Sequence, residues 1–337
     1  MGTFTKASGP PLMRLAHPLA FATFLRKVGA PTEPHFRRAG MPVLCDDANR
    51  FVPLLTAWAF FDSTAQQVDP MLAWHVGRHH GDHGLNAALL RKLETAPTLY
   101  RALHRLVRLI TSESSQLKLR ILERRDDILF CTQYSDLKEM PGYASSQAYQ
   151  LEVYLDVIRH FLGRRWVPDE IGIEYPIVPA VVEEHFPGSR ILTGQRMGWI
   201  AIPRSCLHIA AGSSSPGDGA KDSLVLADRF DYVDTLRALL RTYLSEGYPS
   251  AKLAASLMDT SVRTLHRRLS MCGVRYQEVI DEVRFDRSKE LLRVSSAPIG
   301  EVAFECGFTD PAHFSRMFRR IGGLGPGQFR RANQVEG

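Results

Sequence analysis

Apolar positions recur at helical spacing in two short segments near the C-terminal end of the chain, and the two patterns match. The segments are 261–269 and 310–318, which begin 49 residues apart. Each opens with a residue type that caps helix N-termini, Ser261 or Asp310, so each predicts a helix. Residues four apart share one face of a helix. The fifth and ninth positions of both segments are apolar and predict a buried stripe: Leu265, Leu269, Phe314 and Phe318.

The surrounding pattern predicts a helix and a tight turn before each segment. Ser250 can cap a helix that leads to Asp259, and Pro298 suits the first turn of a helix that leads to Gly307. Glycine, and aspartate better than most residues, accept the left-handed backbone that such a turn needs. Further helical patterns precede, connect and follow these pairs. Residues 228–337 are therefore predicted to form seven helices that include two helix-turn-helix units.

The front part of the chain mixes helical and alternating patterns. Thr98 can cap one predicted helix, and a second ends near Leu162. Alternation before the charged turn at residues 123–127, and an apolar run at residues 128–131 after it, predict a β-hairpin. Short apolar runs near Ile171 and Ile200 predict two more strands. The predicted fold class is α+β, with a mixed front domain, a flexible linker and an all-α back domain.

A stretch rich in glycine, serine and proline, residues 211–223, separates the two parts and predicts the linker. We expect residues 1–212 to form the front domain, residues 213–227 the linker, and residues 228–337 the back domain. The first residues, 1–10, are expected to form a mobile tail.

Composition narrows the class of protein. The net charge is +6, from 42 basic and 36 acidic residues, and residues 228–337 carry +3 of it, which permits nucleic-acid binding. No apolar run reaches the ~18–20 residues that a membrane helix needs. The N-terminus has no signal-peptide pattern, so a cytoplasmic protein is predicted. The cysteines are odd in number and form no C-x-x-C pair, which favours small buried thiols over zinc or disulfides: Cys45, Cys131, Cys206, Cys272 and Cys306.

The outward positions of the two segments carry chemistry that can read DNA. Arginine can bond guanine O6 and N7 at once, a contact worth about 1–3 kcal/mol of discrimination between bases. The predicted base-reading residues are Arg263, Thr264, His266, Arg267, Ala312, His313 and Arg316. Other arginines nearby are predicted to contact phosphates, which gives affinity without sequence choice: Arg268, Arg319, Arg320, Arg330 and Arg331.

The helix predicted between the two units, residues 276–292, sets their separation. Its length of about 17 residues spans roughly 25 Å at 1.5 Å per residue. Successive major grooves on one face of a duplex are ~34 Å apart. One polypeptide would then contact two consecutive major grooves of double-stranded DNA.

With these segments in place, the back domain resembles the DNA-binding domain of AraC/XylS-type bacterial transcription regulators. Residues 298–310 and 313–320 match most closely, and residues 325–330 resemble the closing Gly-x-Pro-x-x-Tyr/Phe-Arg of the family. Residues 261–269 look like one branch, the ornithine-utilisation-regulator-like proteins. Residues from about 25 to 210 resemble, more loosely, the arabinose-binding-domain type of front domain.

The sequence departs from the family pattern at three places. Asp259 stands where the first turn usually has glycine, and Ser288 where the connecting helix usually has alanine. Gly322 and Gly323 follow the second reading helix where a bulkier pair is common. These departures affect fine geometry and leave the class unchanged.

The resemblance implies a cytoplasmic regulator, usually an activator, with no enzymatic activity and no cofactor. The front domain would bind a small-molecule effector and form a homodimer. The back domain would bind promoter DNA and touch RNA polymerase. The effector would act by favouring a DNA-competent arrangement of the domains.

The front domain offers weaker signals. Effector pockets are mostly apolar with a few polar groups, and packing in the core is the alternative role for such side chains. The pocket candidates are Trp58, Phe61, Trp74 and His75. His75, His79 and His83 are spaced four apart, but glycines interrupt any helix there, so we predict no metal site.

Two alternatives to an effector-responsive regulator stay open. One is a DNA-repair enzyme with an AraC-like module, which needs a reactive cysteine with positioned partners. The other is a regulator controlled by a protein partner, whose front domain would be packed and have no ligand pocket. The sequence contains no nucleophile elbow, phosphate-binding glycine loop or H-E-x-x-H motif.

Overall fold

The chain folds into two compact units. The computed structural model describes residues 9–78, 85, 87–134, 137–175, 182–183, 186–210 and 227–333. Pro11–Ala39 and Leu54–Arg229 group into unit 1, whereas Gly40–Pro53 and Phe230–Gly337 group into unit 2. The expected tail at residues 1–10 and linker at residues 213–227 fall almost wholly outside the described residues, and so do His79 and His83.

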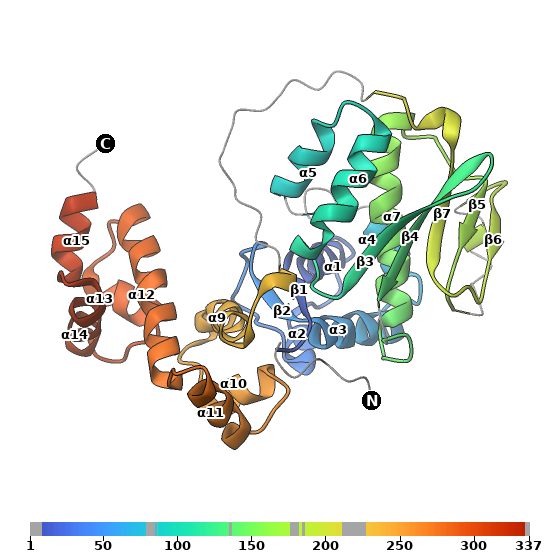
Figure 1. The fold of residues 1–337 in the computed structure, drawn as a ribbon. Helices are drawn as coiled ribbons and strands as arrows, with labels where there is room; N and C mark the ends of the chain where they lie inside the picture. The colour runs from blue at the N-terminus through green and yellow to red at the C-terminus, as the bar shows by residue number, and fades with distance from the viewer. Residues whose placement is uncertain are drawn as a thin grey trace. The chain divides into compact units, whose positions relative to one another are not determined.

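Unit 1 combines helices α1 to α7 with a small sheet, and α6 and α7 contact its strands (Figure 1). The predicted helix after Thr98 is confirmed, because the Thr98 hydroxyl accepts a hydrogen bond from the Arg101 amide. The helices are α1 (Ala16–Lys27), α2 (Glu33–Ala39), α3 (Leu54–Gln67), α4 (Leu72–Arg78), α5 (Ala87–Glu94), α6 (Leu99–Leu109) and α7 (Tyr143–Leu162). Short 3₁₀ turns lie at Ile110–Ser112, Arg204–Cys206 and Ala227–Arg229.

The sheet of unit 1 has five strands in the order β3-β4-β7-β5-β6. The predicted hairpin is confirmed, since β3 pairs antiparallel with β4 from Leu117 opposite Tyr134 to Glu123 opposite Ile128. Leu117 and Leu119 are buried while Lys118 and Arg120 are exposed, as the alternating pattern requires. The strands are β3 (Leu117–Glu123), β4 (Asp127–Tyr134), β5 (Glu170–Gly172), β6 (Arg190–Leu192) and β7 (Gly198–Pro203), and a short strand β1 (Leu12–Arg14) precedes α1.

Helix α7 is largely buried. It begins at Tyr143, and its first turns bury polar side chains such as Gln147 and Gln150, which an apolar pattern does not reveal. Gly142 precedes it with φ 82°. A Cβ atom at Gly142 would lie 2.2 Å from the Trp58 carbonyl oxygen, so glycine allows α3 and α7 to approach.

Unit 2 contains all seven predicted helices, arranged along one long helix (Figure 1). The α10–α11 pair lies at one end of α12 and the α13–α14 pair at the other. The helices are α9 (Tyr232–Tyr243), α10 (Ala251–Leu257), α11 (Val262–Met271), α12 (Tyr276–Val294), α13 (Ile299–Glu305), α14 (Pro311–Gly322) and α15 (Pro326–Asn333). A 3₁₀ turn at Leu244–Glu246 follows α9, and the strand β2 (Phe51–Pro53) also belongs to this unit.

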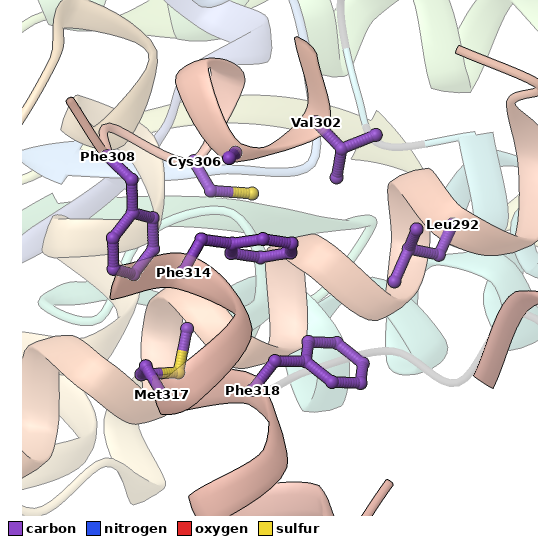
Figure 2. Close-up of a cluster of buried hydrophobic side chains, with 8 residues drawn as sticks. Leu292, Val302, Cys306, Phe308, Phe314, Met317 and Phe318 are labelled. Carbon is purple, nitrogen blue, oxygen red and sulfur yellow. The ribbon is translucent and has the colours of Figure 1, made fainter. Parts of the chain in front are cut away.

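The second helix pair of unit 2, α13 and α14, packs around a separate hydrophobic core (Figure 2). Figure 2 shows side chains from α13, α14 and the end of α12 converging there. The buried members are Leu292, Val302, Ala303, Cys306, Phe308, Phe314, Met317 and Phe318. Burial of several large apolar side chains, each worth about 1.5–3 kcal/mol, fixes the angle between α13 and α14.

The predicted fold class is confirmed: unit 1 mixes helices with a sheet, and the described part of residues 228–337 is helical. Among the described residues, no helix is long and apolar enough to cross a membrane.

Candidate DNA-binding surface

The first reading helix, α11, forms as its sequence pattern predicted. The Ser261 hydroxyl accepts a hydrogen bond from the Thr264 amide at 3.2 Å, which satisfies one free donor of the first turn. Leu265 and Leu269 are fully buried. The opposite face of α11 is therefore turned outward.

Predicted base-reading residues lie on this outward face. Arg263, His266 and Arg267 are exposed. Thr264 is half-buried, and its hydroxyl accepts a hydrogen bond from Ser261 at 3.0 Å. Neither Arg263 nor Arg267 has an ion-pair or hydrogen-bond partner in the described part of the chain. Their guanidinium groups are thus free to meet a base edge or a phosphate.

The second reading helix, α14, repeats this construction. The Asp310 carboxylate accepts hydrogen bonds from the amides of Ala312 and His313, at 2.8 and 3.2 Å. Pro311 occupies the first helical position, where no amide is needed. Phe314 and Phe318 are fully buried in the core of Figure 2.

Ala312, His313 and Arg316 are exposed on the free face of α14. The His313 ring packs edge-on to Phe308, with ring centres 5.5 Å apart. Arg316 lies 3.9 Å from the Asp310 carboxylate, and both side chains are more than half exposed. Exposed ion pairs of this kind contribute little, so Arg316 can exchange this partner for DNA.

The five arginines predicted to contact phosphates fall into two groups. Arg319 and Arg331 are exposed, and neither has a polar partner in the part of the chain that the structure describes. The other three are engaged within unit 2: Arg268 lies over the Tyr232 ring at 5.1 Å, Arg320 pairs with Asp281, and Arg330 donates to the Ala297 carbonyl at 2.6 Å. The structure thus gives those three a packing role in addition to any contact with DNA.

The four residues predicted to line an effector pocket lie in unit 1, three of them in its core. Trp58 and Phe61 are fully buried on α3, and Trp74 is 3% exposed on α4. His75 is partly exposed, lies 3.4 Å from the Asp69 carboxylate and stacks on Phe24. Trp58 packs edge-on to Tyr134, with ring centres 4.9 Å apart.

A small cavity of unit 1, with a mostly apolar lining and a few polar groups, was not predicted from the sequence. It is lined in part by His17, Glu113, Tyr134 and Tyr149, and its volume of about 10 Å³ admits roughly one water. His17 lies 3.3 Å from the Glu113 carboxylate and 3.2 Å from the Tyr149 hydroxyl. The Ser114 hydroxyl is buried there without a hydrogen-bond partner among the described residues. These residues are far apart in sequence, so no local pattern reveals them.

The expectation of buried thiols holds for three of the five cysteines. Cys206 is half-buried and Cys272 is exposed, which corrects the prediction for those two: Cys206 ends the 3₁₀ turn Arg204–Cys206, and Cys272 follows the last residue of α11. Burial raises the pKa of Cys131 and of Cys306 to about 11, and it raises that of Cys45 as well. Such thiols stay protonated at neutral pH and are poor nucleophiles. In the described residues, no group of three metal-ligating side chains comes together.

Two helix-turn-helix units, joined by one helix and each presenting exposed cationic side chains on its second helix, define a DNA-binding protein. A family model described as a helix-turn-helix domain matches residues 254–332. A second, described as the arabinose-binding domain of AraC transcription regulators, matches residues 29–208, more than half of the chain. The chain therefore belongs to the AraC family of transcription regulators.

Relatives agree with this assignment over part of their length. The chain is 38% identical over 85 residues to the ornithine utilization regulator of Pseudomonas aeruginosa, covering 25% of each protein. It is 40% identical over 119 residues to the transcriptional activator RhaS of Escherichia fergusonii, covering 34% of this chain and 42% of that protein. The matches thus span less than half the length of either relative.

Solved structures of related regulators show low overall superposition. The regulator CdpR of Pseudomonas aeruginosa is 22% identical, with a TM-score of 0.37 over 89% of this chain and 96% of that one. The DNA-binding domain of AdpA, solved with a target DNA, is 28% identical, with a TM-score of 0.28 over 31% of this chain and 97% of that one.

Proposed function

We propose that this protein is a sequence-specific transcription regulator whose two reading helices enter successive major grooves of promoter DNA. The observation that carries the proposal is the matched pair α11 and α14, each capped, buried on one face and exposed on the other. The connecting helix α12 has 19 residues. It spans about 28 Å at 1.5 Å per residue, which suits grooves ~34 Å apart.

Base reading is assigned to residues on the outward faces of the two helices, all of them exposed except the half-buried Thr264. On α11 they are Arg263, Thr264, His266 and Arg267, and on α14 they are Ala312, His313 and Arg316. Phosphate contacts are assigned first to the two arginines without internal partners, Arg319 and Arg331. Arg268, Arg320 and Arg330 would add to them only where their guanidinium groups can also reach the backbone of the DNA.

Residues 1–212 are proposed to bind a small effector and to form a homodimer, with residues 213–227 as the linker to the DNA-binding domain at 228–337. The effector would lie beside Trp58, Phe61, Trp74 and His75. Support comes from the small cavity of unit 1, because Trp58 and Phe61 pack behind two of its lining residues, Tyr134 and Tyr149. A ligand larger than one water would push these lining residues against α3.

Activation, rather than repression, is proposed from the printed role of the relative RhaS, an activator. Activation at a promoter implies contact with RNA polymerase in the cytoplasm. No enzymatic step is assigned to the chain, because the regulators that it resembles are described by their control of transcription.

Control by a protein partner is the second candidate, and the small cavity volume of about 10 Å³ favours it. A thermal-shift screen of small metabolites on the full chain separates the two. A metabolite that raises the Tm and changes promoter affinity supports the effector. A chain that no metabolite stabilises, but whose DNA binding changes with a captured protein, supports the partner.

The DNA-binding proposal is tested by selecting bound sequences from random duplexes and footprinting the best site. We expect protection in two consecutive major grooves on one face of the duplex. Protection of a single groove would contradict the two-helix assignment.

A further inference from the structure

Arg284 is a charged residue in the interior of unit 2. It lies on α12 and is only 4% exposed. Its guanidinium carbon lies 4.3 Å from the centre of the Tyr248 ring and 4.1 Å from that of the Phe308 ring. Nη2 donates a hydrogen bond to the Gly307 carbonyl. Two aromatic faces and one carbonyl therefore hold this cation.

No carboxylate within the described residues forms an ion pair with Arg284, and its Nε is buried without a hydrogen-bond partner there. Burial is the main cause that lowers the pKa of Arg284. A buried cation is costly unless it is compensated, and here the compensation depends on the position of two rings. Stacking of a planar guanidinium constrains geometry more than a point charge does.

The groups around Arg284 come from both helix-turn-helix units. Tyr248 lies just before α10 of the first unit, whereas Gly307 and Phe308 form the turn of the second unit. The two segments are in close contact, since a Cβ atom at Gly307 would lie 3.4 Å from the Tyr248 amide nitrogen. The Tyr276 hydroxyl also donates to the Pro249 carbonyl at 2.5 Å, which fastens the same loop to the start of α12.

We propose that Arg284 is a positioning residue that fixes the two helix-turn-helix units relative to each other, and so sets the spacing of the two DNA half-sites. The inference rests on the proposed entry of α11 and α14 into successive grooves. A shift of one unit against the other would pull a ring or the carbonyl away from the buried guanidinium. The distance between the two reading helices, α11 and α14, is therefore fixed when the protein binds DNA.

Loosening this link has a specific consequence for DNA binding. Two modules joined rigidly at the right separation bind together with a high effective concentration, whereas a looser joint lowers that concentration and widens the range of spans. Each helix would keep its own base preference. The preference for one spacer length would weaken.

The test compares Arg284→Met and Arg284→Lys with the wild-type full chain on the selected DNA site. Spacer variants of that site have one base pair inserted or removed between the two protected grooves. For the wild type we expect each change to weaken binding by about tenfold or more, and for both variants by less than about threefold. Base preferences within each half-site should stay as in the wild type. Arg287→Lys, on the same helix but with only a 3.4 Å contact to Glu290, is the matched control.

A merely structural role would lower the Tm and weaken binding to all spacers by the same factor, and that result would overturn the proposal. Should the Arg284 variants not fold, Tyr248→Leu removes one ring at a position that is 46% exposed and should flatten the same spacer profile. An unchanged profile in folded Tyr248→Leu would equally overturn it. A wild type that is itself indifferent to spacer length would instead refute the two-groove function on which the inference rests.

Discussion

Asp259 and Gly307 hold equivalent left-handed positions in the two helix-turn-helix units, with φ 47° and 73°. Each is the second residue after its helix, and the amide of the residue that follows it donates back into the last turn: Thr260 to the Ala255 carbonyl, and Phe308 to the Ala303 carbonyl, both at 2.9 Å. Among the described residues, Asp259 is the one non-glycine residue with positive φ. The first turn therefore has the same left-handed backbone conformation as the second, with aspartate in place of glycine and a strained backbone.

Replacement of Asp259 tests this geometry. A left-handed backbone costs an ordinary side chain about 1–2 kcal/mol relative to glycine. We expect Asp259→Gly to be at least as stable as the wild type in urea unfolding, and Asp259→Ala to be less stable than Asp259→Gly by about 1 kcal/mol. Equal stability of the alanine and glycine variants would show that the turn is not strained.

Base reading by the exposed arginines predicts a loss of specific affinity without a loss of fold. For Arg267→Ala or Arg316→Ala we expect binding to the selected site to weaken by about tenfold to a hundredfold, with little change in non-specific binding. Gel shifts on the selected site and on scrambled duplex measure the ratio. Arg101→Ala, an exposed arginine on α6 of unit 1, is the control and should bind as the wild type does.

Salt dependence separates phosphate contacts from packing contacts. Removal of one phosphate contact lowers the slope of log K against log[salt] by about one. We expect this for Arg319→Ala and Arg331→Ala. For Arg330→Ala we expect a lower Tm instead, because its hydrogen bond to the Ala297 carbonyl would be lost. A full slope change with an unaltered Tm in Arg330→Ala would contradict the packing role.

The buried thiol of Cys306 predicts an alkaline loss of stability. Burial is the main cause that raises its pKa from 9.0 in the unfolded chain to about 11. Because the pKa is higher in the folded state, the stabilisation is complete below pH 9 and is lost as the pH rises through 11. Between these pH values we expect the wild type to lose about 2 kcal/mol more than Cys306→Ala. Parallel curves from denaturant titrations under reducing conditions would refute the assignment.

The sequence predicted the parts whose cause is local. Each reading helix is defined by residues within or next to it: the caps Ser261 and Asp310, and apolar residues four apart. Both helices can therefore be predicted without knowledge of the fold. The hairpin before and after residues 123–127 was predictable for the same reason. The start of α7 was not, because its first turns are buried by packing against α3 and not by an apolar pattern of their own.

Contacts between residues far apart in the chain could not be predicted from the sequence pattern. Arg284 lies next to Val283 on the buried side of α12. A charged residue among buried positions was the one sequence signal that its guanidinium has partners inside the protein. Nothing local indicated which rings those were. The same holds for the pairing of Arg320 with Asp281, which engages an arginine that the sequence marked only as a phosphate contact.

The sequence by itself thus determined that there are two capped helices with outward cations, because capping and helical periodicity act over one or two turns of the chain. Only the tertiary structure decided which of those cationic side chains have partners within the protein and which have none among the described residues. It also decided that Tyr248, Arg284 and Phe308 meet in one stack. The physical reason is that charge pairing and ring stacking depend on distance in space, and the folded chain brings together residues that its order keeps apart.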